Sequence, residues 1–306
     1  MKTLKQILMI AVAATFLTGC LSTSGPIVFD EFKANDNDSF AKTTMRLGGS
    51  NKFVDSKAGE GVTREVVGKN VNSAMQVLSL NFLGLLQDSI TDSMIEDEPL
   101  AEKPYYIIEV DNVSEQDLLN EKELENITIK AELKLIALAK SAGFKLSDRR
   151  MVQKGRFAHY PVINNDEICK SYTEASSVEC GILIFTRNVA SYNKTTRKAY
   201  VGLGVLSMPI TTFISSKYSG SDVSLFVPKR MVSYGSKYNK YQVAETAMVI
   251  HAGKAHRFVR GATLEDGIEI DDLKFFFGIK DKQNNDKQTL YTVNPYDLSL
   301  TEVPLN

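Results

Sequence analysis

The chain has 306 residues with 36 basic and 37 acidic side chains, which gives a formal net charge of −1. Nucleic-acid-binding proteins usually carry a clear basic excess, so this near-balance argues against a nucleic-acid partner. With 43% hydrophobic residues the chain can bury a substantial core, in one large domain or two small ones.

Residues 1–19 predict a signal peptide. Lys2 and Lys5 precede an apolar run over residues 7–17, and Thr18-Gly19-Cys20 follows it. This order of basic, apolar and small residues is typical of a secretory signal. As a helix the run spans about 16 Å, which is too short to cross a hydrocarbon core of about 30 Å, so we expect it to be removed.

The tetrapeptide Leu17-Thr18-Gly19-Cys20 resembles the lipobox of bacterial lipoproteins. The resemblance implies that the Cys20 thiol receives a diacylglycerol, that the chain is cut before Cys20, and that the new amine receives a further acyl chain such as palmitate. Two or three acyl chains make a stable anchor, because one chain alone binds a membrane only marginally. The alternatives are an ordinary secretory signal with a chance cysteine, or a buried N-terminal helix.

The residue after the cysteine bears on localisation. In enterobacterial-type lipoproteins an aspartate there resembles an inner-membrane retention signal, and this chain has Leu21 instead. We therefore expect an anchor in the outer membrane, facing the periplasm, with the inner membrane as the alternative. Residues 21–26 contain serine, threonine, glycine and proline and predict a short flexible tether.

Residues 20–61 are expected to hold the lipid anchor, the tether and an irregular segment. Asn35-Asp36-Asn37-Asp38 and Gly48-Gly49-Ser50-Asn51 break this polar stretch into short pieces. Such clusters favour loops, so we expect loops with one or two weak strands.

Residues 62–155 predict a helix-strand-helix-strand unit. Apolar residues at steps of three and four indicate an amphipathic helix over residues 67–85, with Thr63 as its N-cap, and residues 105–110 indicate a buried strand. The same spacing predicts a second helix, with an acidic start and Gly143 after its end. Its apolar positions are Leu124, Ile127, Ala131, Leu135, Leu138 and Ala142. Residues 144–147 predict the next strand.

The segment over residues 105–150 resembles the core unit of periplasmic lipoproteins of the penicillin-binding-protein-activator and curli-secretion type. The resemblance rests on a strand ending in Asp111-Asn112, a long helix, and a glycine-headed segment that ends near Asp148-Arg149. It implies a non-catalytic envelope role, either docking on a cell-wall synthase or building a secretion or surface assembly. The insertion over residues 114–120 and the part of the chain after Gly181 depart from that pattern.

Residues 156–306 predict a β-rich part in the same domain or in one closely packed on it. Turn clusters separate six strand-like runs, at residues 181–189, 199–206, 223–227, 244–251, 268–279 and 289–293. The expected fold class is therefore α+β, or α/β, with amphipathic helices on a mixed sheet and a β-rich C-terminal part.

Cys169 and Cys180 are expected to form a disulfide, because the periplasm oxidises thiols. The short loop between them would gain about 2–3 kcal/mol in the chain-entropy model. A metal pair or a reactive thiol are the alternatives, and neither cysteine has a histidine nearby in the sequence.

No motif predicts catalysis or a cofactor. His251 and His256 lack the Glu of a His-Glu-x-x-His zinc motif, and with His159 they are the only histidines, so we expect ordinary surface or strand-end histidines rather than metal ligands. Gly202-Leu203-Gly204 lacks the third glycine of a dinucleotide site and is interpreted as a close backbone approach or a bulge. The chain also lacks the Gly-x-Ser-x-Gly motif of serine hydrolases.

A basic and aromatic cluster is the candidate partner-binding surface. It consists of Lys229, Arg230, Tyr234, Lys237, Tyr238, Lys240 and Tyr241. Aromatic residues and arginine are enriched at protein interfaces, and the cations could also meet an anionic glycan or phospholipid headgroups. The alternative is a solvated loop. A further run over residues 201–214, with Pro209 inside it, predicts a core strand rather than a membrane-inserted hairpin, because its alternation is not clean.

These observations favour a lipid-anchored periplasmic structural or interaction protein, part of an envelope assembly such as a secretion, conjugation or pilus apparatus. A regulator that docks on a cell-wall synthase is the first alternative, and a periplasmic enzyme of unknown reaction is the second. The expected partners are the membrane, through the N-terminal lipid, and envelope proteins, with a homo-oligomer as one option.

Overall fold

The computed structural model of the protein describes residues in both halves of the chain. They are residues 25–49, 53, 55, 64–66, 104–148, 150–153, 157–163, 169, 181–206, 208–227, 232–234, 241–243, 247–258, 267–270, 273–281, 287–293 and 299–302. The predicted helix over residues 67–85 and the predicted signal peptide and lipobox lie outside these ranges. The prediction that Thr63 is the N-cap of that helix was wrong, because the residues that follow it form a strand, β2 (Arg64–Val66).

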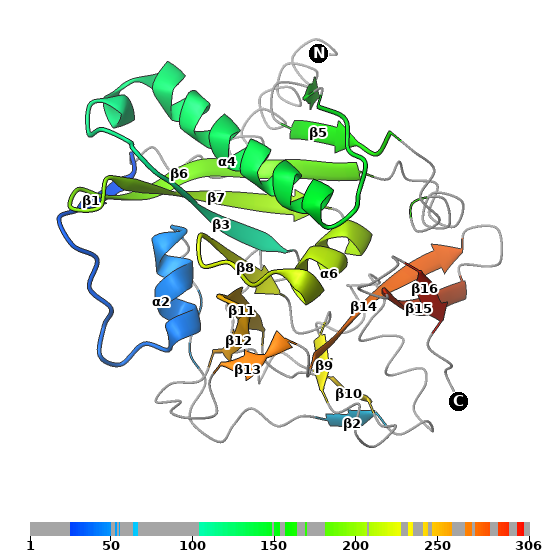
Figure 1. Ribbon diagram of the computed structural model, residues 1–306. Coiled ribbons are helices and arrows are strands. Elements are labelled where there is room, and N and C mark those ends of the chain that lie inside the picture. Colours follow the sequence, from blue (N-terminus) through cyan, green and yellow to red (C-terminus); the bar gives the residue numbers. More distant parts are fainter. Residues whose placement is uncertain are drawn as a thin grey trace, which may run out of the picture.

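A ten-stranded sheet forms the centre of the molecule (Figure 1). Its strands run in the order β13-β12-β11-β8-β3-β7-β6-β5-β4. The strand β1 pairs with residues 191–193 of β6, beyond the part of β6 that pairs with β5. Their bounds are β1 Ile27–Phe29, β3 Tyr105–Val110, β4 Met151–Gln153, β5 Phe157–Pro161, β6 Gly181–Asn193, β7 Lys198–Leu206, β8 Val223–Val227, β11 Met248–His251, β12 Lys254–Arg257 and β13 Ile268–Glu269. Neighbours are antiparallel except for the parallel pair β1 and β6, so the sheet is mixed.

A second sheet has six strands in the order β16-β15-β14-β9-β10-β2. Their bounds are β2 Arg64–Val66, β9 Val232–Tyr234, β10 Tyr241–Val243, β14 Leu273–Asp281, β15 Lys287–Val293 and β16 Leu300–Glu302. All of its neighbouring strands are antiparallel. The expected α+β class with a β-rich C-terminal part is confirmed.

Helices cover both faces of the ten-stranded sheet. They are α2 (Phe40–Leu47), α4 (Glu121–Ser141) and α6 (Met208–Lys217), and a short turn of 3-10 helix, η3 (Asp117–Leu119), precedes α4. The central strand β3 shows why two faces are needed. Tyr106 and Ile108 pack in one cluster with α4 and α6, whereas Tyr105 and Ile107 pack in another with α2. Successive side chains of a strand point to opposite faces, so a strand apolar on both faces needs a cover on each.

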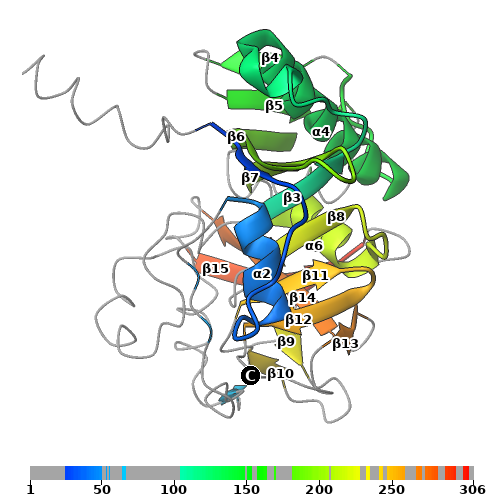
Figure 2. The same ribbon diagram turned by 90° about the vertical axis from the view of Figure 1, so that its left-hand side faces the viewer.

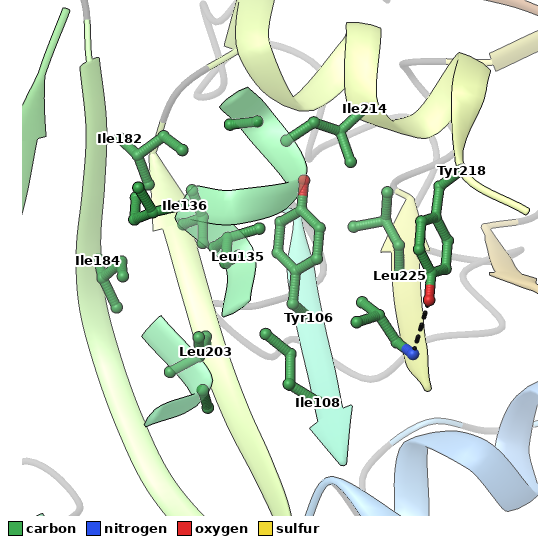
Figure 3. Close-up of a cluster of buried hydrophobic side chains, with 14 of the residues drawn as sticks. Tyr106, Ile108, Leu135, Ile136, Ile182, Ile184, Leu203, Ile214, Tyr218 and Leu225 are labelled. Carbon is green, nitrogen blue, oxygen red and sulfur yellow. Dashed lines mark hydrogen bonds between the residues drawn. The ribbon is translucent and has the colours of Figure 1, made fainter. Parts of the chain in front are cut away.

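The cluster on the α4 face is the larger of the two (Figure 3). Tyr106 of β3 lies there among Leu135 of α4, Ile214 of α6 and Leu225 of β8. All four side chains are buried. Burial of this apolar surface, at roughly 25 cal/mol per Å², is the main source of stability in such a core.

The predicted acidic start and terminal glycine lie at the two ends of α4, and the structure adds an N-cap that was not predicted. The side chain of Asn120 caps the helix by accepting hydrogen bonds from the backbone N–H groups of Lys122 and Glu123. After Ala142 the chain turns at Gly143, whose φ of 107° is open to glycine and strained for other residues. The predicted second helix and the predicted strand β3 are thus confirmed.

The helix α2 was not expected, because its polar sequence was interpreted as loops and weak strands. Ser39 caps it by accepting from the N–H of Lys42, and the Ser39 hydroxyl donates to Asp55. Ala41 and Met45 are fully buried. Buried side chains one turn apart, together with a cap, are enough to hold this helix against a sheet, but with eight residues between two turn clusters it is too short to be recognised in the sequence.

Three other predictions were wrong in part. The strand-like run over residues 268–279 is divided between β13 of the ten-stranded sheet and β14 of the six-stranded sheet. Residues 144–147 do not form a strand. Leu146 makes an isolated antiparallel β-bridge with Val162. The apolar run over residues 201–214 is a strand only as far as Leu206 and continues as α6. Pro209 lies in the first turn of that helix, a place where the missing N–H of proline does no harm.

The helices of the described residues include none that is both long and apolar enough to span a membrane.

Candidate functional site

The strongest polar constellation surrounds Glu132 of α4, which is fully buried. Its carboxylate accepts hydrogen bonds from Arg150 Nε at 2.7 Å and Arg187 Nη1 at 2.9 Å. Arg150 Nη2 adds a contact at 3.3 Å. Arg187 belongs to β6, and Arg150 directly precedes β4. The cluster therefore ties the helix to the edge of the sheet.

The hydroxyl of Tyr160 on β5 completes this cluster by donating to Glu132 Oε2 at 2.9 Å. Burial, and then the neighbouring Glu132 charge, raise the pKa of Tyr160, so it stays a neutral donor. The carboxylate thus has four donor contacts from three side chains. A general base must have a lone pair free for the substrate proton, and here the donors of the fold occupy the carboxylate. The arrangement is that of a structural clamp.

A second polar cluster joins α4, α6 and β8. Lys134 Nζ lies 2.5 Å from Asp222, and Tyr218 donates to the same carboxylate while accepting from the N–H of Val223, the bond dashed in Figure 3. Burial would raise the pKa of Asp222, but the hydrogen bonds from Lys134 and Tyr218 outweigh it and lower the pKa. Burial and the Asp222 charge raise the pKa of Tyr218. These groups also hold one another in place.

The two C-terminal histidines come together on one face of the β11–β12 hairpin, although their spacing did not predict this. The register pairs Val249 with His256 and His251 with Lys254, so the two imidazoles are diagonal neighbours. Phe40 of α2 packs on both, with ring centroids 5.3 Å from His251 and 4.1 Å from His256.

The environment of His251 lowers its pKa. Burial is the larger cause, and the nearby His256 acts in the same direction, while Glu109 acts against them. His251 Nδ1 also shares a hydrogen bond of 2.9 Å with Ser224 Oγ. The remaining histidine, His159, is buried on β5, which four strands separate from β11. Among the described residues, no three His, Cys, Asp or Glu side chains are grouped as metal ligands.

The glycines of Gly202-Leu203-Gly204 lie in β7, as the interpretation of a close approach requires. A Cβ on Gly202 would lie 1.7 Å from the hydroxyl oxygen of Tyr105, and one on Gly204 would lie 2.2 Å from Thr186 Oγ1. The Tyr105 hydroxyl passes over Gly202 to donate to the carbonyl of Gly48 at 2.9 Å. These glycines therefore serve packing between β3, β6 and α2.

The basic and aromatic cluster is described only at two positions. Tyr234 ends β9, where it pairs with Gln242 and Leu273, and Tyr241 begins β10, where it pairs with Val66. These two tyrosines thus belong to the six-stranded sheet. Lys229, Arg230, Lys237, Tyr238 and Lys240 lie outside the described residues, so their role stays a prediction.

The cysteine pair is also only half described. Cys169 is buried within the core cluster of the α4 face, and Cys180 lies outside the described ranges, as Cys20 does. A bond between Cys169 and Cys180 stays a prediction.

Sequence analysis missed the Glu132 cluster. The signal that could have revealed it is a glutamate on the buried stripe of α4, which runs through Ile127, Thr128, Ala131, Glu132, Leu135, Ile136 and Ala139. A charged side chain there must have buried partners. Which arginines supply them depends on strand pairings that the spacing of residues does not show.

No protein-family model, curated protein or solved structure matches the chain. The resemblance of residues 105–150 to envelope lipoproteins therefore rests on the order of elements alone. Of that order the structure has the strand β3 and the helix α4, with a single bridge at Leu146 in place of the final strand.

Proposed function

We propose that the protein is a lipoprotein of the bacterial envelope, anchored through Cys20, whose folded part works through protein contacts. The observation that carries this proposal is Leu17-Thr18-Gly19-Cys20 directly after a short apolar run. The fold supports it, because the first strand of the ten-stranded sheet begins at Ile27, close behind the lipidation site. A domain that starts this soon after the cysteine is held near the membrane surface.

The polar groups of the fold support a structural rather than a catalytic role. The carboxylates of Glu132 and Asp222 are both held by arginine, lysine or tyrosine side chains within the domain. A surface that binds a partner should therefore lie outside the Glu132 and Asp222 clusters. The basic and aromatic cluster, of which Tyr234 and Tyr241 lie in the six-stranded sheet, is the proposed surface. An envelope assembly at the periplasmic face of the outer membrane is the proposed setting.

The lipid anchor is tested by replacing Cys20 with serine. We expect the wild-type protein to incorporate a labelled palmitate analogue and to fractionate with outer membranes, and the Cys20→Ser variant to do neither. Mass spectrometry of the N-terminal peptide identifies the diacylglycerol directly. Equal labelling of the variant and the wild type would overturn the proposal.

The partner surface is tested by charge reversal at two lysines of the cluster, Lys237→Glu with Lys240→Glu. We expect partners that co-purify with the wild type from detergent-solubilised envelopes to be absent from the double variant. Their binding to the wild type should weaken as salt is added. The matched control is Lys122→Glu with Lys130→Glu on α4, which should retain them. If a co-purified partner is retained equally by both double variants, the cluster is not the interface.

A further inference from the structure

One end of the ten-stranded sheet gathers three segments that are far apart in the sequence. They are β1, the turn between β6 and β7 (Lys194, Thr195, Thr196 and Arg197) and the loop that carries η3. This group is here named the turn end. It lies at the left of Figure 1 and faces the viewer in Figure 2.

Hydrogen bonds and an ion pair join these segments into one unit. The N–H of Lys194 donates to the Phe29 carbonyl at 3.0 Å, and the N–H of Val113 donates to the Arg197 carbonyl at 3.1 Å. Lys194 Nζ also lies 3.3 Å from a carboxylate oxygen of Glu115, in the loop before η3. The position of β1 is therefore coupled to the positions of the turn and of η3.

We propose that the turn end is the surface of the domain that rests on the bilayer. This inference depends on the proposed lipidation of Cys20, which fixes one end of a short connection. The chain from Cys20 to Ile27 can span at most about 25 Å, even fully extended. Ile27 is therefore always within about that distance of the lipid anchor.

This limit excludes the inverted orientation. Ile27 pairs with Ser191, near the turn, whereas β6 begins at Gly181, about 30 Å away along the strand. If the Gly181 end touched the bilayer and the sheet stood upright, Ile27 would lie beyond the reach of the connection. An upright sheet can therefore stand only on its turn end.

Exposed apolar side chains distinguish this upright orientation from one in which the sheet lies flat. Leu119 of η3 is 86% exposed, more than any other large hydrophobic residue described, and Ile27 and Val28 of β1 are 51% and 42% exposed. A single exposed leucine is ordinary on a protein surface. An anchored domain, however, meets the membrane at a high effective concentration, so even a weak apolar contact is populated.

Of the two cations in the turn between β6 and β7, Lys194 is paired within the domain. Lys194 lies between two carboxylates, Glu115 at 3.3 Å and Asp30 at 3.7 Å. Its charge is balanced within the domain rather than available to an anionic lipid. Leu119, two residues before the first position of α4, is the side chain expected to reach deepest into the interface.

The test uses the fact that the chain contains no tryptophan. Leu119→Trp and Thr196→Trp each place one fluorophore at the turn end. Ile163→Trp is the matched control, because Ile163 is also exposed, at 65%, but follows β5 beyond the Gly181 end of β6. The lipidated full-length variants are reconstituted into phosphatidylcholine vesicles, with and without brominated phosphatidylcholine, which quenches tryptophan that touches the acyl chains.

We expect several-fold greater quenching at position 119 than at position 163, and intermediate quenching at position 196. Thr196→Trp keeps the test decisive if the Leu119 variant does not fold. Equal quenching at both ends, or stronger quenching at position 163, would overturn the inference while leaving the anchor in place. Mass spectrometry of the same samples reports lipidation separately, and an unmodified Cys20 would overturn both the inference and the proposed function.

Discussion

On one face of the ten-stranded sheet α4 is fixed by a buried carboxylate and its arginine and tyrosine donors, whereas on the other face α2 is fixed by a cap and by apolar and aromatic packing. The first helix has 21 residues and the second has eight. We therefore expect the packing of the two helices to respond to different perturbations. Removal of the buried Glu132 charge should destabilise the packing of α4. A change of pH near neutrality should instead change the stability of the α2 face, where His251 lies.

The largest effect is expected from Glu132→Gln. This change leaves the buried ends of Arg150 and Arg187 facing a neutral amide, and breaking a buried ion pair from one side costs about 3–5 kcal/mol. Urea unfolding monitored by circular dichroism measures the loss. Glu125→Gln is the matched control, since Glu125 lies 4.0 Å and 3.7 Å from the same arginines but is 54% exposed, so its loss should be below about 1 kcal/mol. Similar losses for both variants would contradict the account of the α4 face.

The second effect concerns the proposed bond between Cys169 and Cys180. Cys169 is buried on the α4 face, so the bond would fix one more segment there. Non-reducing mass spectrometry of protein taken from the periplasm should show the two peptides joined, and Cys180→Ser should lower the free energy of unfolding by about 2–3 kcal/mol. Two free thiols in that sample would rule the bond out.

The smallest effect is expected on the α2 face, from the titration of His251. Its pKa in the folded protein lies below that in the unfolded chain, so the unfolded chain binds the proton more readily. The contribution of His251 to the free energy of unfolding should therefore be complete above about pH 6.5, the pKa of an unperturbed histidine. This contribution should decrease as the pH drops below that value.

The measurement is the urea midpoint at about pH 7.5 and about pH 5.5, on either side of the histidine range. We expect His251→Gln to reduce the difference between the two midpoints. His159→Gln is the comparison, because His159 lies far from α2 in the strand order. An undiminished difference in the His251 variant would show that another group controls this pH dependence.

The contrast between the faces also marks what the sequence could predict. The helix α4 has a long periodic pattern, an acidic start and Gly143 after its end, and the strand β3 is a run of aromatic and β-branched residues, so both were predicted closely. The helix α2 is short and polar on most of its surface, and α6 continues an apolar run in which Pro209 was interpreted as lying inside a strand. In both cases the tertiary contacts, rather than local propensity, decide the structure.

The candidate sites follow the same division. Local patterns suggested the role of Gly202 and Gly204 in close packing, because glycine in a strand has few other uses. The Glu132 cluster and the meeting of Phe40 with two histidines could not be predicted in this way. They depend on segments brought together by sheet pairing, and Phe40 is separated from His251 by most of the chain.

The pairing of β1 with β6 has a consequence for the order of folding. Ile27 meets Ser191 only after the ends of a loop of more than 160 residues have come together, whereas β6 and β7 join through a tight turn. Closing so long a loop is slow and entropically costly. The hairpin is therefore expected to form early and β1 to dock late. If Cys20 is lipidated as proposed, the sheet would then be completed next to the membrane as one of the last steps of folding.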